Sequence, residues 1–226
     1  MASSDIAVIF DMDGVLVDTF EAHFESWNVV AHEEGTEMTR QQFAATFGRT
    51  SREIIALLWP EKADDRAAVR DFDDRKEAAF RGIIARALPA MPGVRELLSS
   101  LASAGIRMAI GSSGPSANVA LVVEKLEAAE LFGTLITADD VTRGKPVPQV
   151  FLLAAERLGI PPQRCVVVED APPGVTAAHA AGMGCVGIAS TGRTRAELAN
   201  ADLVIDSLSE LTPEVFRRLV DGRNGS

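Results

Sequence analysis

The stretch IAVIFDMDGVLVDT, from Ile6 to Thr19, joins an apolar run to two closely spaced acids. The apolar residues predict a buried strand, and Asp11 and Asp13 follow where that strand ends. Two carboxylates one residue apart make each other costlier to ionise unless a cation or a proton lies between them. A turn alone would need a single Asp and a Gly, so the pair indicates a site with chemistry.

Similar apolar runs recur along the chain after glycine or proline, with helical patterns between most of them. Buried strands separated by amphipathic helices are typical of a parallel sheet that is covered on both faces. The sequence therefore predicts an α/β fold with a doubly wound parallel-sheet core. The expected strands are Ile6–Phe10, Arg107–Gly111, Thr134–Thr137, Cys165–Glu169, Cys185–Ala189 and Leu203–Asp206.

One connection, from about residue 16 to residue 88, is far longer than the others and carries only helical patterns. Connections in compact α/β proteins are usually short, so this one indicates an inserted all-α helical cap domain. We expect an α/β core domain over residues 1–15 and 89–226 and the cap over residues 16–88. An insert placed directly after the two acids is expected to act as a lid. Asp18 and Glu21 fit a helix-capping pair at its start.

Composition and charge restrict the class of partner. The chain has 226 residues, of which 47% are hydrophobic and 24% charged, and a formal net charge of −10. This acidic balance argues against nucleic acid and anionic membranes, whereas a small phosphorylated metabolite stays compatible with it. The amino terminus lacks the pattern of a signal peptide, and Cys165 and Cys185 lie in apolar runs. We expect a cytoplasmic protein with buried thiols, either a monomer or a small homo-oligomer.

Polar side chains follow several predicted strands, at the edge where ligands bind in open α/β sheets. They are Ser112 and Ser113 after the second strand, Lys145 before a helix, and Glu169 and Asp170 after the fourth strand. The acids supply the oxygen ligands that Mg²⁺ prefers, and the serine and lysine suit a phosphate group. A further carboxylate is then available for covalent or acid–base chemistry.

Each of these residues also has an ordinary structural interpretation. Asp11 could be a loop acid, and Lys145 could pair with any acid on a negative surface. Glu169 and Asp170 could be one solvated strand end. The convergence of such groups at one edge of one sheet favours the catalytic interpretation.

These residues resemble the motifs of the haloacid dehalogenase superfamily, in order and along nearly the whole chain. The stretch DMDGVLVDT resembles the first motif, Ser112 in AIGSS the second, Lys145 in GKPVPQVF the third, and VVVEDAPPG the fourth. The branch of that superfamily that works without a metal lacks an acid at the position of Asp13. Its presence here points to phosphoryl transfer.

The resemblance implies a role for each residue of the motifs. Asp11 is the nucleophile that forms an aspartyl-phosphate, and Asp13 is the general acid and base. Mg²⁺ is held by Asp11, the backbone carbonyl of Asp13 and Asp170, with Glu169 close by or ligating. Lys145 offsets the charge repulsion between the attacking carboxylate and the phosphate.

A finer resemblance is to the group of β-phosphoglucomutase-like proteins and sugar phosphatases with a helical cap. It implies substrate-binding roles for Thr19, His23, Arg52, Lys76, Ser113 and Asn118. His23 shares one helix face with Thr19 and Trp27, where a histidine that only packs is also common.

We expect a Mg²⁺-dependent phosphatase that hydrolyses a small phosphorylated metabolite, such as a sugar phosphate, through an aspartyl-phosphate. The alternative is a β-phosphoglucomutase. Two departures favour hydrolysis, because Gly48 stands where the mutase has a lysine and SSGPSAN differs from the mutase's Ser-Lys-Asn segment. A receiver-type signalling domain would be shorter and lack the insert. A catalytically silent binding module would show no metal-dependent turnover.

Overall fold

The computed structural model describes residues 6–46, 51–189 and 192–224. The chain forms two compact units, one of Met1–Asp18 with Leu88–Ser226 and one of Thr19–Ala87. We term the first the core unit and the second the helical unit. The limits expected from the sequence, residues 1–15 and 89–226 against 16–88, stay a prediction of where independently folding domains begin and end.

The core unit contains a six-stranded parallel sheet in the order β3-β2-β1-β4-β5-β6. In the central strand, Ile9 lies opposite Ala109 on one side and Val167 on the other. The predicted fold class is confirmed, and each expected strand agrees with the observed one to within one residue at either end. The strands are β1 (Ala7–Phe10), β2 (Arg107–Gly111), β3 (Thr134–Ile136), β4 (Cys165–Glu169), β5 (Gly184–Ile188) and β6 (Leu203–Ile205).

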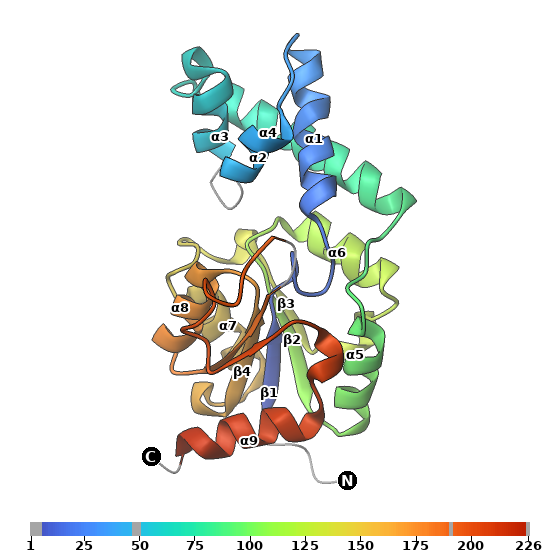
Figure 1. The fold of residues 1–226 in the computed structure, drawn as a ribbon, viewed down its shortest axis with the longest axis vertical. Helices are drawn as coiled ribbons and strands as arrows, with labels where there is room; N and C mark the ends of the chain where they lie inside the picture. Colours follow the sequence, from blue (N-terminus) through green and yellow to red (C-terminus); the bar gives the residue numbers. More distant parts are fainter. Residues whose placement is uncertain (1–5, 47–50, 190–191, 225–226) are drawn as a thin grey trace. The chain divides into compact units, whose positions relative to one another are not determined.

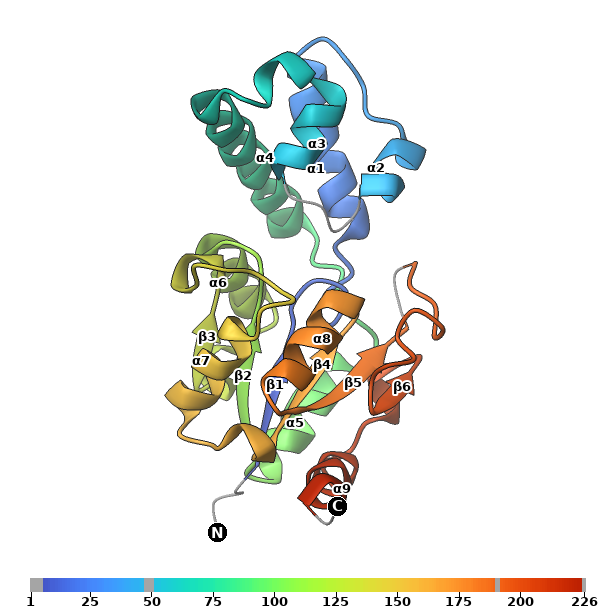
Figure 2. The ribbon, with the colours of Figure 1, turned by 90° about the vertical axis from the view of Figure 1, so that its left-hand side faces the viewer.

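Helices cover both faces of this sheet, as right-handed crossovers between parallel strands require. α7 and α8 pack on the face that presents Ile9, Ala109 and Val167, and α5 and α9 pack on the opposite face (Figures 1 and 2). The helices are α5 (Val94–Ser103), α6 (Ser116–Lys125), α7 (Gln149–Leu158), α8 (Pro172–Ala180) and α9 (Pro213–Asn224). Short 3₁₀ helices span Ala129–Leu131, Ala138–Asp140, Pro162–Arg164 and Leu208–Glu210.

The strand order reverses between β1 and β4, and ligands bind outside the carboxyl ends of strands at such a switch point. Beyond β1, the Asp11 N–H still donates to the Val168 carbonyl at 2.9 Å. The chain then turns at Gly14, whose φ is +74°. Val17 forms a β-bridge with Ala90, so the outgoing and returning chains pair within the core unit.

The helical unit packs its helices around aromatic residues that include Trp27, Phe43 and Phe72. The proposed capping pair of Asp18 and Glu21 is wrong. The Asp18 N–H donates to the Pro89 carbonyl at 2.8 Å, which holds Asp18 beside the returning chain, and α1 begins one residue after Thr19. The helices are α1 (Phe20–Glu33), α2 (Arg40–Thr46), α3 (Ser51–Leu58) and α4 (Arg66–Arg86), with a 3₁₀ helix over Pro60–Lys62. Over the described part of the chain, no helix has both the length and the apolar character needed to cross a membrane.

Candidate active site

Three buried carboxylates converge where β1 and β4 end, and they belong to Asp11, Glu169 and Asp170. One oxygen from each lies within 4.8 Å of the others. Lys145, from the loop before α7, reaches into this group. Its Nζ donates to Asp11 Oδ1 at 2.8 Å and to Glu169 Oε1 at 2.6 Å. The fold thus brings together residues that lie far apart in the sequence.

Two glycines lie so close to these acids that a side chain at either position would overlap a carboxylate. Gly14 adopts a positive φ, and a Cβ there would lie 2.3 Å from Asp170 Oδ2. Near the start of α8, a Cβ on Gly174 would lie 1.8 Å from Glu169 Oε1. Any larger residue would displace a carboxylate. Sequence reasoning missed Gly174, although a glycine inside a helix, where alanine is about 1 kcal/mol more favourable, was a usable signal.

The environment of Asp11 opposes its ionisation. The pKa of Asp11 is raised to about 7, chiefly by burial; Lys145 opposes the rise, and the charges of Glu169 and Asp13 contribute to it. For Lys145, burial alone would lower the pKa, but Asp11 and Glu169 outweigh burial and the pKa is raised. Lys145 is therefore a permanent cation at neutral pH.

Asp170 is in a similar position, because burial and the charges of Glu169 and Asp11 raise its pKa well above the ordinary value. Lys145 and Arg193 oppose this rise. Arg193 lies on the connection after β5 and was missed by sequence reasoning, since its approach to Asp170 depends on the tertiary fold. The carboxylates of the cluster outnumber the ammonium that bridges them, so the donor set fits a hard divalent cation such as Mg²⁺.

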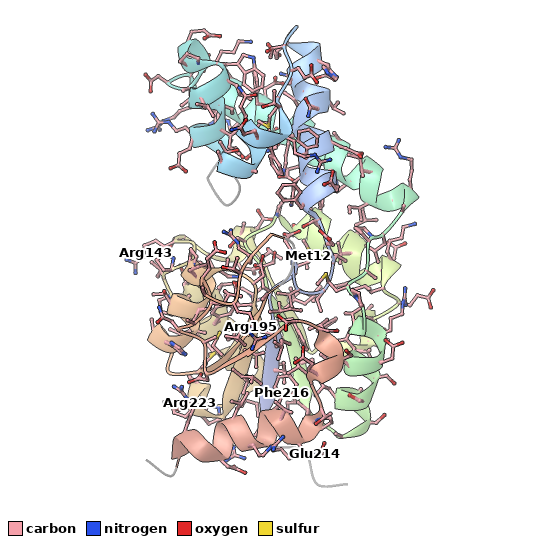
Figure 3. The ribbon with its side chains drawn as sticks, in the orientation of Figure 1. Met12, Arg143, Arg195, Glu214, Phe216 and Arg223 are labelled. Carbon is pink, nitrogen blue, oxygen red and sulfur yellow. The ribbon has the colours of Figure 1, made fainter. Side chains whose placement is uncertain are left out.

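Asp13 and Ser112 both lie close to Gly114. A Cβ at Gly114 would be 3.3 Å from Ser112 Oγ and 3.9 Å from Asp13 Oδ2. Ser112 is buried and its Oγ accepts a hydrogen bond from the Gly114 N–H at 3.0 Å, whereas Asp13 is partly exposed. Met12, which separates Asp11 from Asp13 in the sequence, is buried. It lies at the end of the core unit opposite to Glu214 and Arg223 of α9 (Figure 3). The second acid is therefore more open to solvent than Asp11.

The other predicted residues of the second strand end differ in exposure. Ser113 is exposed, while Asn118, in the first turn of α6, is buried. Both belong to the core unit.

In the helical unit, the structure brings together two residues that the resemblance assigned to substrate binding. His23 Nδ1 lies 3.0 Å from Lys76 Nζ, and the His23 ring stacks on Phe80 with the centroids 4.3 Å apart. Lys76 is buried, and its Nζ also donates to Glu77 Oε1 at 2.7 Å. The neighbouring carboxylate thus balances the charge of this lysine.

Arg52 is held elsewhere in the helical unit. Its guanidinium donates to Asp64 Oδ1 at 2.9 Å and to the Ala63 carbonyl at 3.1 Å, and its side chain is exposed. Thr19 is buried just before α1. Gly48, whose identity weighed against a mutase, lies outside the described residues.

A family model, curated relatives and a solved structure all relate this chain to haloacid dehalogenase-like proteins. The family model for the haloacid dehalogenase-like hydrolases matches residues 7–182. The chain is 34% identical over 177 residues to a phosphorylated carbohydrates phosphatase of Thermotoga maritima, with 78% of this chain and 82% of the relative covered. It is 31% identical over 216 residues to a β-phosphoglucomutase of Bacillus subtilis, with 93% of each covered. A crystal structure of β-phosphoglucomutase from Clostridium difficile superposes with a TM-score of 0.84 at 26% identity, covering 97% of this chain and 99% of that one.

Proposed function

Because this chain belongs to the haloacid dehalogenase-like hydrolase family, we propose that it is a Mg²⁺-dependent phosphatase that hydrolyses a sugar phosphate or a similar small phosphate ester. The observation that carries the proposal is the buried group in which Lys145 bridges Asp11 and Glu169 beside Asp170. The name of the Thermotoga maritima relative supports the choice of substrate class.

In the first proposed step, a carboxylate oxygen of Asp11 attacks the phosphorus and forms a new O–P bond. The bond from phosphorus to the substrate oxygen breaks, and Asp13 gives that oxygen a proton. Lys145, which contacts Asp11 directly, reduces the repulsion between the attacking carboxylate and the phosphate. The partial exposure of Asp13 suits a group that exchanges protons with a leaving group and with water.

In the second step, Asp13 takes a proton from a water molecule whose oxygen attacks the phosphorus. The bond between Asp11 and phosphorus breaks, inorganic phosphate leaves, and Asp11 is restored. Ser112 and Ser113 would hold the phosphate oxygens beside this group. When bound, Mg²⁺ would neutralise charge on the phosphate and the acids, held by Asp11, the Asp13 carbonyl and Asp170, with Glu169 close by.

The second candidate is a phosphoglucomutase, which the match to the Bacillus subtilis protein favours. A mutase needs cations for a second phosphate. In the helical unit, however, Lys76 is paired with Glu77 and Arg52 with Asp64. These pairings leave neither of the two cations unbalanced for a second phosphate and so support hydrolysis. We propose that the part of the substrate other than its phosphate contacts Thr19, His23, Arg52, Lys76 and Asn118.

The test follows phosphorus by NMR in a mixture of protein, Mg²⁺, β-glucose 1-phosphate and a trace of glucose 1,6-bisphosphate. A panel of other sugar phosphates is run in parallel, with the Asp11→Asn protein as control. We expect free phosphate that depends on Mg²⁺ and is missing in the control. Glucose 6-phosphate without free phosphate would establish the mutase instead. No turnover of any ester would contradict both.

A further inference from the structure

The loop that carries Lys145 is fixed by a residue that the motifs do not assign. This loop connects the 3₁₀ helix Ala138–Asp140 to α7. Gln149 is the first residue of α7, and its Oε1 accepts hydrogen bonds from the Thr142 N–H at 3.1 Å, the Thr142 hydroxyl at 3.2 Å and the Arg143 N–H at 3.1 Å. One side-chain oxygen thus gathers the donors of the two residues that precede Gly144 and Lys145.

On another side, the same loop borders an empty space. A cavity of about 140 Å³ is lined by Thr142, Arg143, Gly144 and Lys145 of the loop and by Ser112 and Ser113 of the second strand end. Ala138, Val141 and Val150 complete the lining of this cavity, so at this wall the loop faces open space rather than direct packing. Arg143 is exposed and lies at the outer surface of the core unit (Figure 3). It contacts α7 through its backbone N–H, which donates to Gln149 Oε1.

α7 also contacts the side chain of Lys145. The Lys145 Nζ lies 4.9 Å from the centroid of the Phe151 ring, in the same helical turn as Gln149. The first turn of α7 thus holds both ends of this lysine: Gln149 anchors the backbone that leads into it, and Phe151 contacts the ammonium. The ammonium must bridge Asp11 and Glu169, where a small displacement would break one of two short contacts.

We propose that Gln149 is a positioning residue that holds the 142–145 loop so that Lys145 bridges Asp11 and Glu169. The catalytic consequence rests on the function proposed above. Without the Gln149 oxygen, Thr142 and Arg143 lose their acceptor, the loop relaxes toward the cavity, and Lys145 no longer stays against both carboxylates. Misplacement of about 1 Å at a reacting group costs about 100-fold in rate.

The test compares Gln149→Met with Gln149→Glu. Gln, Met and Glu have about the same helix propensity, so α7 is affected equally, but only Glu keeps an oxygen at the position of Oε1. We expect Gln149→Met to lower kcat about 10- to 100-fold with KM changed by less than about 3-fold, as for other residues that orient a catalytic group. We expect Gln149→Glu to stay within about 3-fold of the parent protein, since it retains the acceptor.

Gln42→Met is the matched control. Gln42 Oε1 accepts hydrogen bonds from the Thr39 N–H at 2.8 Å and the Thr39 hydroxyl at 2.9 Å, so it is also a glutamine acceptor at the start of a helix, α2 of the helical unit. We expect its kcat to stay within about 2-fold of the parent value, because it touches neither the loop nor Lys145.

A second measurement is independent of turnover. In full-length protein labelled with ¹³C at lysine Cε, the Lys145 signal is identified by its loss in Lys145→Met. We expect this signal to move in Gln149→Met and to stay in place in Gln149→Glu and Gln42→Met. An unmoved signal in Gln149→Met, or an unchanged kcat, would overturn the proposal. If the parent protein turns over no ester, a signal that moves only in Gln149→Met supports the positioning role while the proposed function fails.

Discussion

Two lysines with nearly inaccessible side chains, Lys145 in the core unit and Lys76 in the helical unit, lie in surroundings of different charge. Lys145 bridges two carboxylates that lie 134 and 24 residues away in the sequence, with a third beside them. Lys76 pairs with the carboxylate of the next residue, Glu77, and with the ring of His23. The core cluster holds three carboxyl groups against one ammonium, whereas the helical cluster holds one of each.

This difference follows from the architecture of each unit. A parallel sheet collects the residues that follow separate strands at one edge, so acids from distant motifs meet there and need a cation. In a helix pair, neighbouring residues and residues on facing helices meet, so a charge finds its partner locally. The core unit is thus the place for charge-driven chemistry, and the helical unit offers polar groups without a strong field.

The largest effect expected from this difference is that of Asp11→Asn. Removing the proposed nucleophile should lower kcat at least about 10⁴-fold, as loss of a nucleophile does in other covalent mechanisms. Phosphate release under Mg²⁺ measures it. Glu77→Gln, which alters the acid of the helical cluster, should leave far more activity. Comparable losses in the two variants would show that the units do not differ in the way described.

The second prediction sets the two lysines directly against each other. Lys145→Met should lower kcat about 10²- to 10³-fold, the usual loss for one preorganised electrostatic group, because Asp11 then faces the phosphate without its cation. Lys76→Met should act mainly on KM, since its charge is already balanced by Glu77. Steady-state kinetics of both variants on one substrate measure these changes in kcat and KM. A larger loss of kcat in Lys76→Met would reverse the comparison.

The sequence predicted the strands of the core closely, and the reason is physical. Strands such as Ile6–Phe10 are buried on both faces and read as continuous apolar runs, and acids such as Asp11 and Asp170 must lie where such strands end. The roles assigned to these residues stay predictions, but their convergence could be foreseen. The cap at the start of α1 was placed one residue too early, because the Asp18 N–H donates to the Pro89 carbonyl, far along the chain.

Long-range and side-chain details were also out of reach. Gly174 could have been noticed, but the approach of Arg193 to Asp170 and of Gln149 to Thr142 depends on how loops return to the sheet edge. The pairing of Arg52 with Asp64 depends on the turn between α3 and α4. Helical periodicity gives the face of a residue but not the partner that it meets on a neighbouring segment.

The third prediction compares how an acid of each unit contributes to stabilisation by Mg²⁺. Mg²⁺ at 100 times its Kd should add about 2.7 kcal/mol to the free energy of unfolding of the core unit, by mass action. Asp170→Asn should lose this gain, whereas Asp64→Asn, an acid of the helical unit, should retain it. Thermal melts with and without Mg²⁺ measure the difference. An equal Mg²⁺ effect in parent protein and Asp170→Asn would remove Asp170 from the proposed metal site.

The two thiols report on the core unit alone, since Cys165 and Cys185 both lie in its strands. Burial raises the pKa of Cys165 to about 12. Between the unfolded value of about 8.5 and this folded value, the unfolded chain loses the thiol proton and the folded one keeps it. Stability should therefore fall as pH rises above about 8.5, by up to about 1.4 kcal/mol per pH unit for this thiol. Urea unfolding at several pH values gives the free energy of unfolding as a function of pH. Above about pH 8.5 this free energy should fall less steeply with pH in Cys165→Ala than in the parent protein. An equal dependence on pH in the two proteins would contradict the burial of this thiol.

The smallest effect is expected at the exposed pair of Arg52 and Asp64, whose side chains are 66% and 94% accessible. Exposed ion pairs contribute little to stability, so Asp64→Asn should leave the midpoint of urea unfolding unchanged. It should nevertheless release the Arg52 guanidinium, which the proposed function assigns to the substrate. We therefore expect a lower KM for the phosphate ester at unchanged kcat, and a loss of that gain when Arg52→Met is added. If Asp64→Asn leaves KM as it was, the helical unit does not use Arg52 for recognition, and its balanced charges are structural alone.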